Sequence, residues 1–414
     1  MPVSTPLGLV AALDIGTAKM ACIIARADAQ GHMRVVGSAA RASKGLRNGA
    51  ITDIEAAGHC AGAVVEAAET MARESVDRVI VNLSGGNLCS KHHQVALPLP
   101  SRAIGTHELN QVLSQSRAEV PAQGREVLHF LPLGYGVDGN RGIRDPRGLF
   151  GQTLTLDTIA VTCQDSASRT LRTAIGRAHL EAQQVVASAF AAGLAVLHPD
   201  ERELGITVVD MGAGSTNIGV FYDHELIFCD SLPVGGAHVT HDIAQGLSTP
   251  LAYAERLKTL HGSCLAAASD ERDLLDIQPL ADDGEGDAMQ APRALLVRII
   301  QARIEETLEL VQARIAQSGA ARFSGGAVVL TGGASQLHGL RELAGQMLDK
   351  RIRIGRPAGI AGLADMADNP AFAGVVGLAL FARRQRAGFP AAGSSGGEKT
   401  GMLDRVTGWL KGLR

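Results

Sequence analysis

Two short polar turns, far apart in the chain of 414 residues, each combine an aspartate with glycine and hydroxyl side chains. The first turn runs from Asp14 to Lys19, and the second runs from Asp210 to Asn217. Glycine lets backbone N–H groups approach phosphate oxygens, a hydroxyl donates a hydrogen bond, and a carboxylate holds Mg²⁺, usually through water. Either turn alone is an ordinary hairpin sequence. Two such turns facing each other would hold a triphosphate.

A repeated order of elements supports the pairing of these turns. In the first half, the apolar pattern predicts strands at 7–13 and 20–27, a helix at 54–72 and a strand at 78–83. In the second half, it predicts strands at 204–209 and 218–222, a helix at 294–317 and a glycine turn, Gly332-Gly333-Ala334, after apolar residues 327–330. The second half is longer by about 50 residues, so an insert is expected over about 237–290. The duplication predicts two lobes, each carrying one turn.

A further small α+β unit is expected inside the first half, over 87–164. Residues 127–137 and 153–161 alternate like strands, and residues 108–117 have a helical pattern. Neither a GxxxxGK[ST] pattern nor a GxGxxG after the first strand is present, which disfavours those two nucleotide-binding schemes.

Composition excludes several classes of protein. Hydrophobic residues make up 46% of the chain and charged residues 20%, which excludes disorder over most of the length. A net charge of −3 argues against a protein whose whole surface binds nucleic acid. The six cysteines are scattered without a CxxC pair, so we expect reduced cytosolic thiols. No signal peptide is expected, and no apolar run approaches the roughly 20 residues that span a bilayer.

The composition of the last 29 residues predicts a flexible tether followed by an amphipathic helix. Residues 386–400 are rich in Gly, Ser, Ala and Pro, and residues 401–414 place apolar side chains at steps of three and four. A helix of this kind suits the headgroup layer of an anionic membrane, and a final helix packed on the body is the alternative. The predicted membrane-binding residues are Met402, Leu403, Arg405, Val406, Trp409, Leu410, Lys411, Leu413 and Arg414.

The three glycine turns resemble the two phosphate loops and the adenosine loop of the actin, Hsp70 and sugar-kinase superfamily. The resemblance implies an α/β fold of two duplicated lobes with ATP and Mg²⁺ between them, and Asp14 and Asp210 holding the Mg²⁺ through water. The segment 254–258 resembles an AExxK motif near the ribose and base, although Glu255 and Lys258 could equally form a solvated helix face. The implied ATP-binding residues are Asp14, Gly16, Thr17, Ala18, Lys19, Asp210, Gly212, Ala213, Gly214, Ser215, Thr216, Asn217, Gly236, Glu255, Lys258, Gly332, Gly333 and Ala334.

Within that superfamily the chain resembles the FtsA family of bacterial cell-division proteins over nearly its whole length. The resemblance rests on residues 14–19, 200–205, 330–334 and 353–357. It implies an actin-like fold with an inserted subdomain 1C, ATP binding, self-association into filaments and docking of the FtsZ C-terminal tail. It also implies peripheral attachment to the cytoplasmic face of the inner membrane at the division septum, and recruitment of later divisome proteins through subdomain 1C.

The resemblance further implies a division of the chain and a docking site. Arg293 and Arg303, in the implied subdomain 2B, are candidates for contact with the FtsZ tail by approximate alignment, and solvated helix charges are the alternative. The implied parts are 1A (7–86, 165–203 and the return helix 359–385), 1C (87–164), 2A (204–236 and 305–358), 2B (237–304), the linker (386–400) and the membrane helix (401–414).

The second turn departs from the family pattern. Many members carry Gly-Gly-Gly-Thr and then an acidic residue, whereas this chain has Ala213, Ser215 and Asn217. Nucleotide binding should survive these changes, but no general base can be named, which fits slow hydrolysis or none.

Two other interpretations remain open. The chain could be an adaptor resembling the type IV pilus protein PilM, which has a small inserted subdomain but is not expected to end in a tether and amphipathic helix. It could also be a small-molecule kinase of the sugar-kinase type. A kinase would need a positioned carboxylate base in a substrate pocket, and the sequence shows no such signal.

Overall fold

The computed structural model describes residues 8–28, 32–120, 123–280, 289–366 and 368–386, and its first lobe is built on a five-stranded sheet. The strand order is β11-β6-β1-β2-β3, in which β1 pairs in parallel with β6 and antiparallel with β2. The strands are β1 (Leu9–Ile15), β2 (Lys19–Ala27), β3 (Met33–Ala42), β6 (Arg78–Leu83) and β11 (Glu181–Ala187).

The second lobe repeats this order strand for strand. Its part of a nine-stranded sheet runs β18-β17-β12-β13-β14, with β12 parallel to β17 and antiparallel to β13. The strands are β12 (Ile206–Met211), β13 (Thr216–Tyr222), β14 (Glu225–Leu232), β17 (Ala327–Thr331) and β18 (Arg351–Ile354). The predicted duplication is therefore confirmed at the level of sheet topology.

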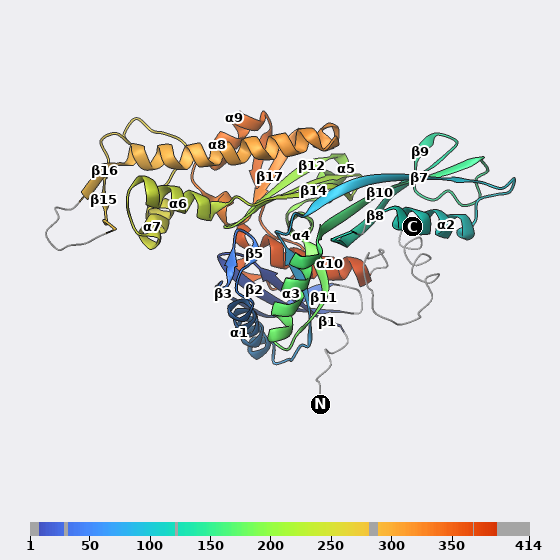
Figure 1. The fold of residues 1–414 in the computed structure, drawn as a ribbon, viewed down its shortest axis with the longest axis horizontal. Helices are drawn as coiled ribbons and strands as arrows, with labels where there is room; N and C mark the ends of the chain where they lie inside the picture. The colour runs from blue at the N-terminus through green and yellow to red at the C-terminus, as the bar shows by residue number, and fades with distance from the viewer. Residues whose placement is uncertain (1–7, 29–31, 121–122, 281–288, 367, 387–414) are drawn as a thin grey trace.

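The remaining four strands of the nine-stranded sheet belong to the insert of the first half. They continue from β14 in the order β7-β10-β8-β9, through the single residue pair Asp230–Cys89, and extend the molecule to the right in Figure 1. The elements are β7 (Cys89–Pro98), α2 (Thr106–Glu119), β8 (Arg125–Val137), β9 (Asn140–Ile143) and β10 (Thr153–Gln164).

Helices cover both lobes, and α6 to α8 form the opposite end of the molecule (Figure 1). The helices of the first lobe and of the junction are α1 (Ile54–Ala72), α3 (Asp165–Arg177), α4 (Ser188–Val196), α5 (Pro199–Leu204) and α10 (Ala373–Arg386). Those of the second lobe are α6 (Gly236–Gly246), α7 (Leu251–His261), α8 (Arg293–Gln317) and α9 (Leu340–Leu348). Two short hairpins complete the fold, namely β4 (Leu46–Arg47) with β5 (Ala50–Ile51), and β15 (Leu274–Ile277) with β16 (Met289–Pro292).

The lobes and the insert meet around the helix pair α4 and α10. A Cβ at Gly377 of α10 would lie 1.8 Å from the carbonyl oxygen of Ala191, so only glycine allows these helices to approach so closely. The rings of Phe190 and Phe381 pack edge-on beside His129, which comes from the insert and is 2% exposed. Burial lowers the pKa of His129 to about 3, so this imidazole joins the core as a neutral side chain.

Several predicted elements are confirmed, and the predicted order is corrected in one respect. The helix at 54–72 and the strand at 78–83 have the predicted bounds, and the helix at 294–317 begins one residue earlier. The predicted order omitted β9 and β18, which have only four residues each. It also omitted β3 and β11 of the first lobe, β14 of the second lobe and β7 of the insert. These strands contain small or polar residues that weaken the alternation on which strand prediction depends.

The C-terminal predictions lie outside the described residues, because the structure describes nothing beyond residue 386. Within the described ranges, no helix is both long enough and apolar enough to cross a bilayer.

Candidate functional site

The two polar turns have the same local geometry. In each, a glycine N–H donates to a carbonyl oxygen three residues later, from Gly16 to Lys19 at 3.1 Å and from Gly212 to Ser215 at 2.9 Å. Each aspartate lies inside the strand rather than in the turn, since Asp14 pairs with Ala21 on β2. The strands therefore fix the carboxylates, and the glycines shape the tips that follow.

The tips of the two turns touch across the lobes. A Cβ at Gly214 would lie 2.3 Å from Oγ1 of Thr17 and 2.7 Å from the backbone nitrogen of Gly49. The N–H of Gly49 donates to Oγ1 of Thr17 at 3.0 Å, and a Cβ on Gly49 would lie 3.3 Å from that of Ser215. Two segments almost 200 residues apart in sequence thus face each other, as the duplicated pattern predicted.

Asp14 is held by neutral groups of the first lobe. The side chain of Asn82, at the end of β6, donates to Oδ1 of Asp14 at 2.5 Å and accepts from the backbone nitrogen of Ile15 at 2.7 Å. The first turn of α10 closes in from the other side, where a Cβ at Gly374 would lie 3.0 Å from Oδ2 of Asp14. Burial raises the pKa of Asp14, although Lys19 and the Asn82 amide oppose this shift.

Asp210, in the second lobe, resembles Asp14 in that burial raises the pKa of its side chain. Burial raises the pKa of Asp210 to about 7, and the neighbouring charge of Asp14 adds to this shift. The amide of Asn217 donates to Oδ2 of Asp210 at 3.4 Å, and Lys19 also counteracts the shift. Two carboxylates therefore share one low-dielectric site, which favours any cation that can join them.

The positive charge of Lys19 interacts with the carboxylates of both aspartates. Burial lowers its pKa, whereas the charges of Asp14 and Asp210 raise it. Its ammonium group donates to the carbonyl oxygen of Ala371 at 2.7 Å and lies 3.4 Å from the centre of the Phe372 ring. One ammonium against two carboxylates leaves the site short of positive charge when both are ionised.

The third glycine turn reaches the same place from β17. Gly332 has a φ of 84°, and a Cβ there would lie 2.5 Å from Oδ1 of Asp210, so glycine is required for both reasons. Gly333 begins a short 3₁₀ turn, and Ala334 lies against α6, 3.2 Å from where a Cβ of Gly236 would stand.

The start of α6 is bonded to the second turn. The N–H of Gly236 donates to the carbonyl oxygen of Gly212 at 2.9 Å, and that of Ala237 donates to Ala213 at 2.8 Å. These bonds satisfy donors that a helix start otherwise leaves open. A change in the turn would therefore be passed directly to α6.

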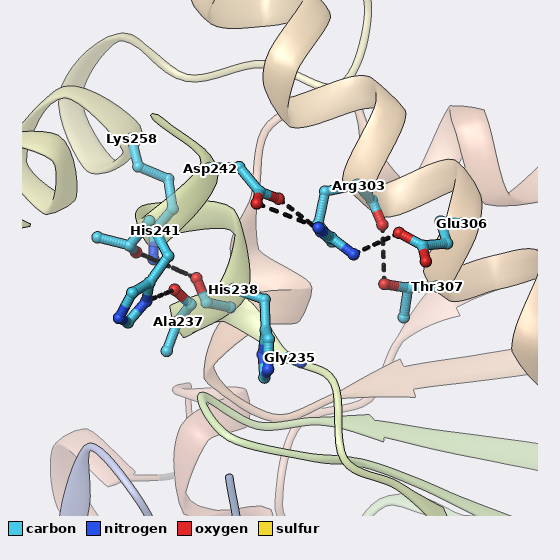
Figure 2. A network of polar contacts seen from close by, with 11 residues as sticks. Gly235, Ala237, His238, His241, Asp242, Lys258, Arg303, Glu306 and Thr307 are labelled. Atoms are coloured by element: carbon cyan, nitrogen blue, oxygen red, sulfur yellow. Dashed lines mark hydrogen bonds and ion pairs between the residues drawn. The ribbon is translucent and has the colours of Figure 1, made fainter. Parts of the chain in front are cut away.

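Lys258 reaches α6 from α7, as Figure 2 shows. Its ammonium group donates to the carbonyl oxygen of Gly236 at 3.1 Å and to Oε2 of Glu255 at 2.6 Å, and the Lys258 side chain is only 13% exposed. The Glu255 side chain is 54% exposed. A solvated helix face therefore describes Glu255 but not Lys258, which converges with Gly236 and Ala334.

Some of the predicted ATP-binding residues form hydrogen bonds within their own lobe. Oγ1 of Thr216 donates to the carbonyl oxygen of Val234 at 2.8 Å, and the carbonyl oxygen of Ala18 accepts from the N–H of Ser43 at 2.9 Å. Sequence reasoning also missed Asn82, although a detectable signal was present, because an asparagine there interrupts an apolar strand just before a glycine turn.

The two arginines predicted for docking both lie on α8 in ion pairs. Arg303 contacts Asp242 of α6 at 2.5 Å and also pairs with Glu306, and Figure 2 shows all three. Arg293, about 15 Å away along the helix axis, pairs at 2.5 Å with Asp270, whose side chain is 1% exposed. The second pair is thus largely internal, whereas the first is half-buried.

Two lobes of matching topology, with an aspartate turn from each meeting between them, define an actin-like protein. Solved structures agree with this class. The PilM–PilN type IV pilus biogenesis complex has a TM-score of 0.62 at 17% identity, covering 90% of this chain and 98% of the other. MreB5 of Spiroplasma citri bound to ADP has a TM-score of 0.55 at 12% identity, covering 92% and 98%. At such identities the likeness shows the fold alone.

Sequence comparison gives the family. The family model described as "Cell division protein FtsA" matches residues 207–377, and that of the "SHS2 domain inserted in FTSA" matches residues 85–162. The cell division protein FtsA of Agrobacterium fabrum is 41% identical over 417 residues, covering 97% of this chain and 94% of that protein. The chain belongs to the FtsA family of cell division proteins, which confirms the predicted family and the predicted fold class.

Asp210→Asn is expected to stabilise the nucleotide-free protein at neutral pH. Because the folded pKa of Asp210 is raised from 3.8 to about 7, the folded state binds more protons than the unfolded state between these values. The free energy of unfolding contributed by this group therefore falls as the pH rises from about 4 to 7. Scanning calorimetry across this range should show a flatter pH dependence and a higher unfolding temperature at pH 7 for the variant.

The matched control for this experiment is Asp273→Asn, which changes an exposed aspartate of the second lobe. It should follow the wild-type curve. An Asp210→Asn curve that falls as steeply as the wild type would contradict the raised pKa.

Proposed function

We propose that this protein is an ATP-binding, actin-like scaffold that anchors FtsZ to the cytoplasmic face of the inner membrane at the division septum. Membership of the FtsA family supports a role in cell division. The observation that carries the nucleotide part is the contact between the two turns at Gly214 and Thr17. In this proposal, the backbone N–H groups of both tips and the ammonium of Lys19 hold the phosphates.

The carboxylates fit a Mg²⁺ ion held mainly by phosphate and water. Asp14 and Asp210 lie on the strands that lead into the two turns, and a cation bound to both would offset the burial that raises their pKa values. Among the described residues, no group of three or more His, Cys, Asp or Glu side chains could bind a metal ion by itself. Mg²⁺ commonly binds through one or two carboxylates, with phosphates and water completing its octahedron.

On the adenosine side, we propose that Gly332, Gly333 and Ala334 contact the adenosine, with Lys258 and Gly236 opposite. The support is the close approach of Ala334 to Gly236 and the burial of the Lys258 ammonium beside them. Asn217, where many family members carry an acid, has an amide that cannot take a proton from water. We therefore propose that ATP sets the conformation and is hydrolysed slowly.

Self-association is supported by apolar side chains exposed at both ends of the elongated molecule. Phe150, in the insert, is 74% exposed, and Leu260 of α7 is 61% exposed. Figure 1 shows the insert and α7 at opposite ends of the molecule. Contiguous apolar patches mark interaction surfaces, and Phe150 directly follows Leu149, which is 42% exposed. Surfaces at two ends suit a head-to-tail filament, and the insert also offers a surface to later divisome proteins.

Membrane attachment is proposed for residues 401–414, joined by the tether at 386–400. One amphipathic helix of this length binds lipid reversibly. A filament aligns many such helices, which raises their effective concentration at the lipid surface and turns weak contacts into firm attachment. Filament formation and anchoring are thereby coupled.

Docking of the FtsZ tail is proposed for the surface formed by α6 and α8. Arg303 lies there with only half-buried partners, so an acidic peptide can compete for its guanidinium group. Arg293 remains a candidate, although its removal would leave the buried carboxylate of Asp270 unpaired, which destabilises the fold by itself.

Lys19→Met is expected to weaken Mg-ATP binding by about tenfold or more, because a charge-assisted contact to phosphate is lost and the two aspartates lose their cation. Isothermal titration calorimetry measures the affinity. Lys350→Met is the matched control, since Lys350 also donates to a backbone carbonyl, that of Gly325 at 2.6 Å. Equal affinities for the Lys19 variant and its control would contradict the proposed phosphate site.

Trp409→Glu is expected to abolish co-sedimentation with vesicles that contain anionic lipid, since a charge replaces the residue predicted to lie at the membrane interface. The affinity for ATP should be unchanged. Trp409→Phe keeps an apolar ring and should still sediment. Sedimentation of the glutamate variant at the wild-type level would remove the anchor from the proposal.

Arg303→Ala is expected to weaken binding of an FtsZ C-terminal peptide severalfold in fluorescence anisotropy, with little change in unfolding temperature. Arg314→Ala, on the same helix but in its last turn, is the control. The double replacement of Arg293 and Arg303 by alanine should abolish peptide binding, provided that its unfolding temperature shows a folded protein. Unaltered affinity in both variants would exclude these arginines from the docking site.

A further inference from the structure

Asp14 is linked to Ser84, the residue that follows β6, by hydrogen bonds through uncharged side chains. Asn82 donates to Asp14 at 2.5 Å and also to Oγ of Ser188 at 3.1 Å. The hydroxyl groups of Ser188 and Ser84 lie 2.8 Å apart. Asn82 and Ser188 are 4% and 3% exposed, so water competes little for these bonds.

This chain of hydrogen bonds crosses to the second lobe at Ser231. Oγ of Ser231, on β14, donates to the carbonyl oxygen of Ser84 and lies 2.9 Å from Oδ1 of Asn217. The other end of the Asn217 amide donates to Asp210 at 3.4 Å, and Asn217 is 3% exposed. The two aspartates are thus linked across the lobes by neutral side chains and by the backbone carbonyl group of Ser84.

We propose that Ser231 and Asn217 are positioning residues that latch the second lobe to the first and thereby hold the Asp210 carboxylate for a nucleotide-bound cation. This inference rests on the proposed nucleotide binding. It adds a part of the site that lies outside the three glycine turns, since Ser231 belongs to β14.

The identity of residue 217 is essential to this arrangement. An amide presents a donor to the Asp210 carboxylate and an acceptor to the Ser231 hydroxyl at the same time, whereas a carboxylate offers acceptors only. An aspartate at 217 would also place a second negative charge within about 3.4 Å of Asp210.

The contacts of Ser231 that form the latch can break easily. The hydroxyl of Ser231 has one hydrogen for two acceptors, the Ser84 carbonyl and the Asn217 amide oxygen, so the two bonds cannot both be at full strength. A cavity of about 360 Å³ lies beside it, lined in part by Asn82, Ser84 and Ser231. None of the residues lining that cavity is charged, and neutral hydrogen bonds can break and reform at a small net cost.

Ser231→Ala in the full-length protein tests the latch by two independent readouts. Without nucleotide, amide hydrogen exchange should become faster at residues 47–50, because Gly49 is covered by Gly214 of the other lobe. With nucleotide, calorimetry should show Mg-ATP binding roughly threefold to tenfold weaker, the loss expected for one or two hydrogen bonds. The Mg²⁺ concentration for half-maximal ATP binding should rise as well.

Controls separate the latch from general damage. Ser166→Ala changes another serine that lines the same cavity without joining the chain, and it should leave every readout unchanged. Ser231→Thr keeps the hydroxyl and should restore affinity. Combining Ser231→Ala with Asn217→Ala should weaken binding by less than the product of the two single effects, because both remove the same chain.

The outcomes distinguish this inference from the proposed function. If the wild type binds no ATP, the proposed function fails, and hydrogen exchange alone decides whether the latch exists. If the wild type binds ATP but Ser231→Ala behaves like Ser166→Ala in exchange and affinity, the latch is overturned. Faster exchange with unchanged ATP and Mg²⁺ dependence would overturn the positioning of Asp210.

Discussion

Two half-buried carboxylates, Asp14 and Asp210, come from different lobes and interact with the charge of one ammonium group, that of Lys19, and this is the constraint on which the structure depends. Burial raises the pKa values of both Asp14 and Asp210, and the charge of Asp14 raises that of Asp210 further, so the arrangement is unfavourable unless something compensates for it. The cost of burying these carboxylates is offset by the packing of the two sheets, which holds the aspartate strands β1 and β12 in place. The glycines at the tips of the turns allow the lobes to touch. In the proposed function, Mg²⁺ arriving with ATP would bring the missing positive charge to this site.

The same constraint explains why the surroundings are neutral and closely packed. Asn82 and Asn217 offer amides to the aspartates instead of further charges. Where the lobes and the insert meet, His129 is kept uncharged among aromatic rings, and Gly377 lets α10 lie against α4. A close-packed junction transmits displacements because it cannot deform gradually. In the second lobe, the first N–H groups of α6 are hydrogen-bonded to the second turn, so a displacement of that turn would shift the start of α6.

Prediction from sequence succeeded where a pattern was long or locally complete. The helix at 54–72 and the strand at 78–83 were predicted with their bounds, because the apolar periodicity of the helix is unbroken and the strand is apolar between Arg78 and Asn82. The strands β3 and β14 were missed, since serine, glycine and alanine in β3 and charged residues in β14 obscure the alternation. Asn82 and Ser231 were missed for another reason, because each gains its role only from a partner on a distant strand.

The sequence by itself determined the two aspartate turns, the duplication and the family, because these depend on residue types and spacings that can be read along the chain. Only the tertiary structure decided that Gly214 meets Thr17, that Arg293 is bound to a buried carboxylate, and that Ser231 joins one lobe to the other. Such contacts depend on how two sheets are placed relative to each other. That placement results from many weak packing interactions summed over the whole core, and no single segment of sequence records it.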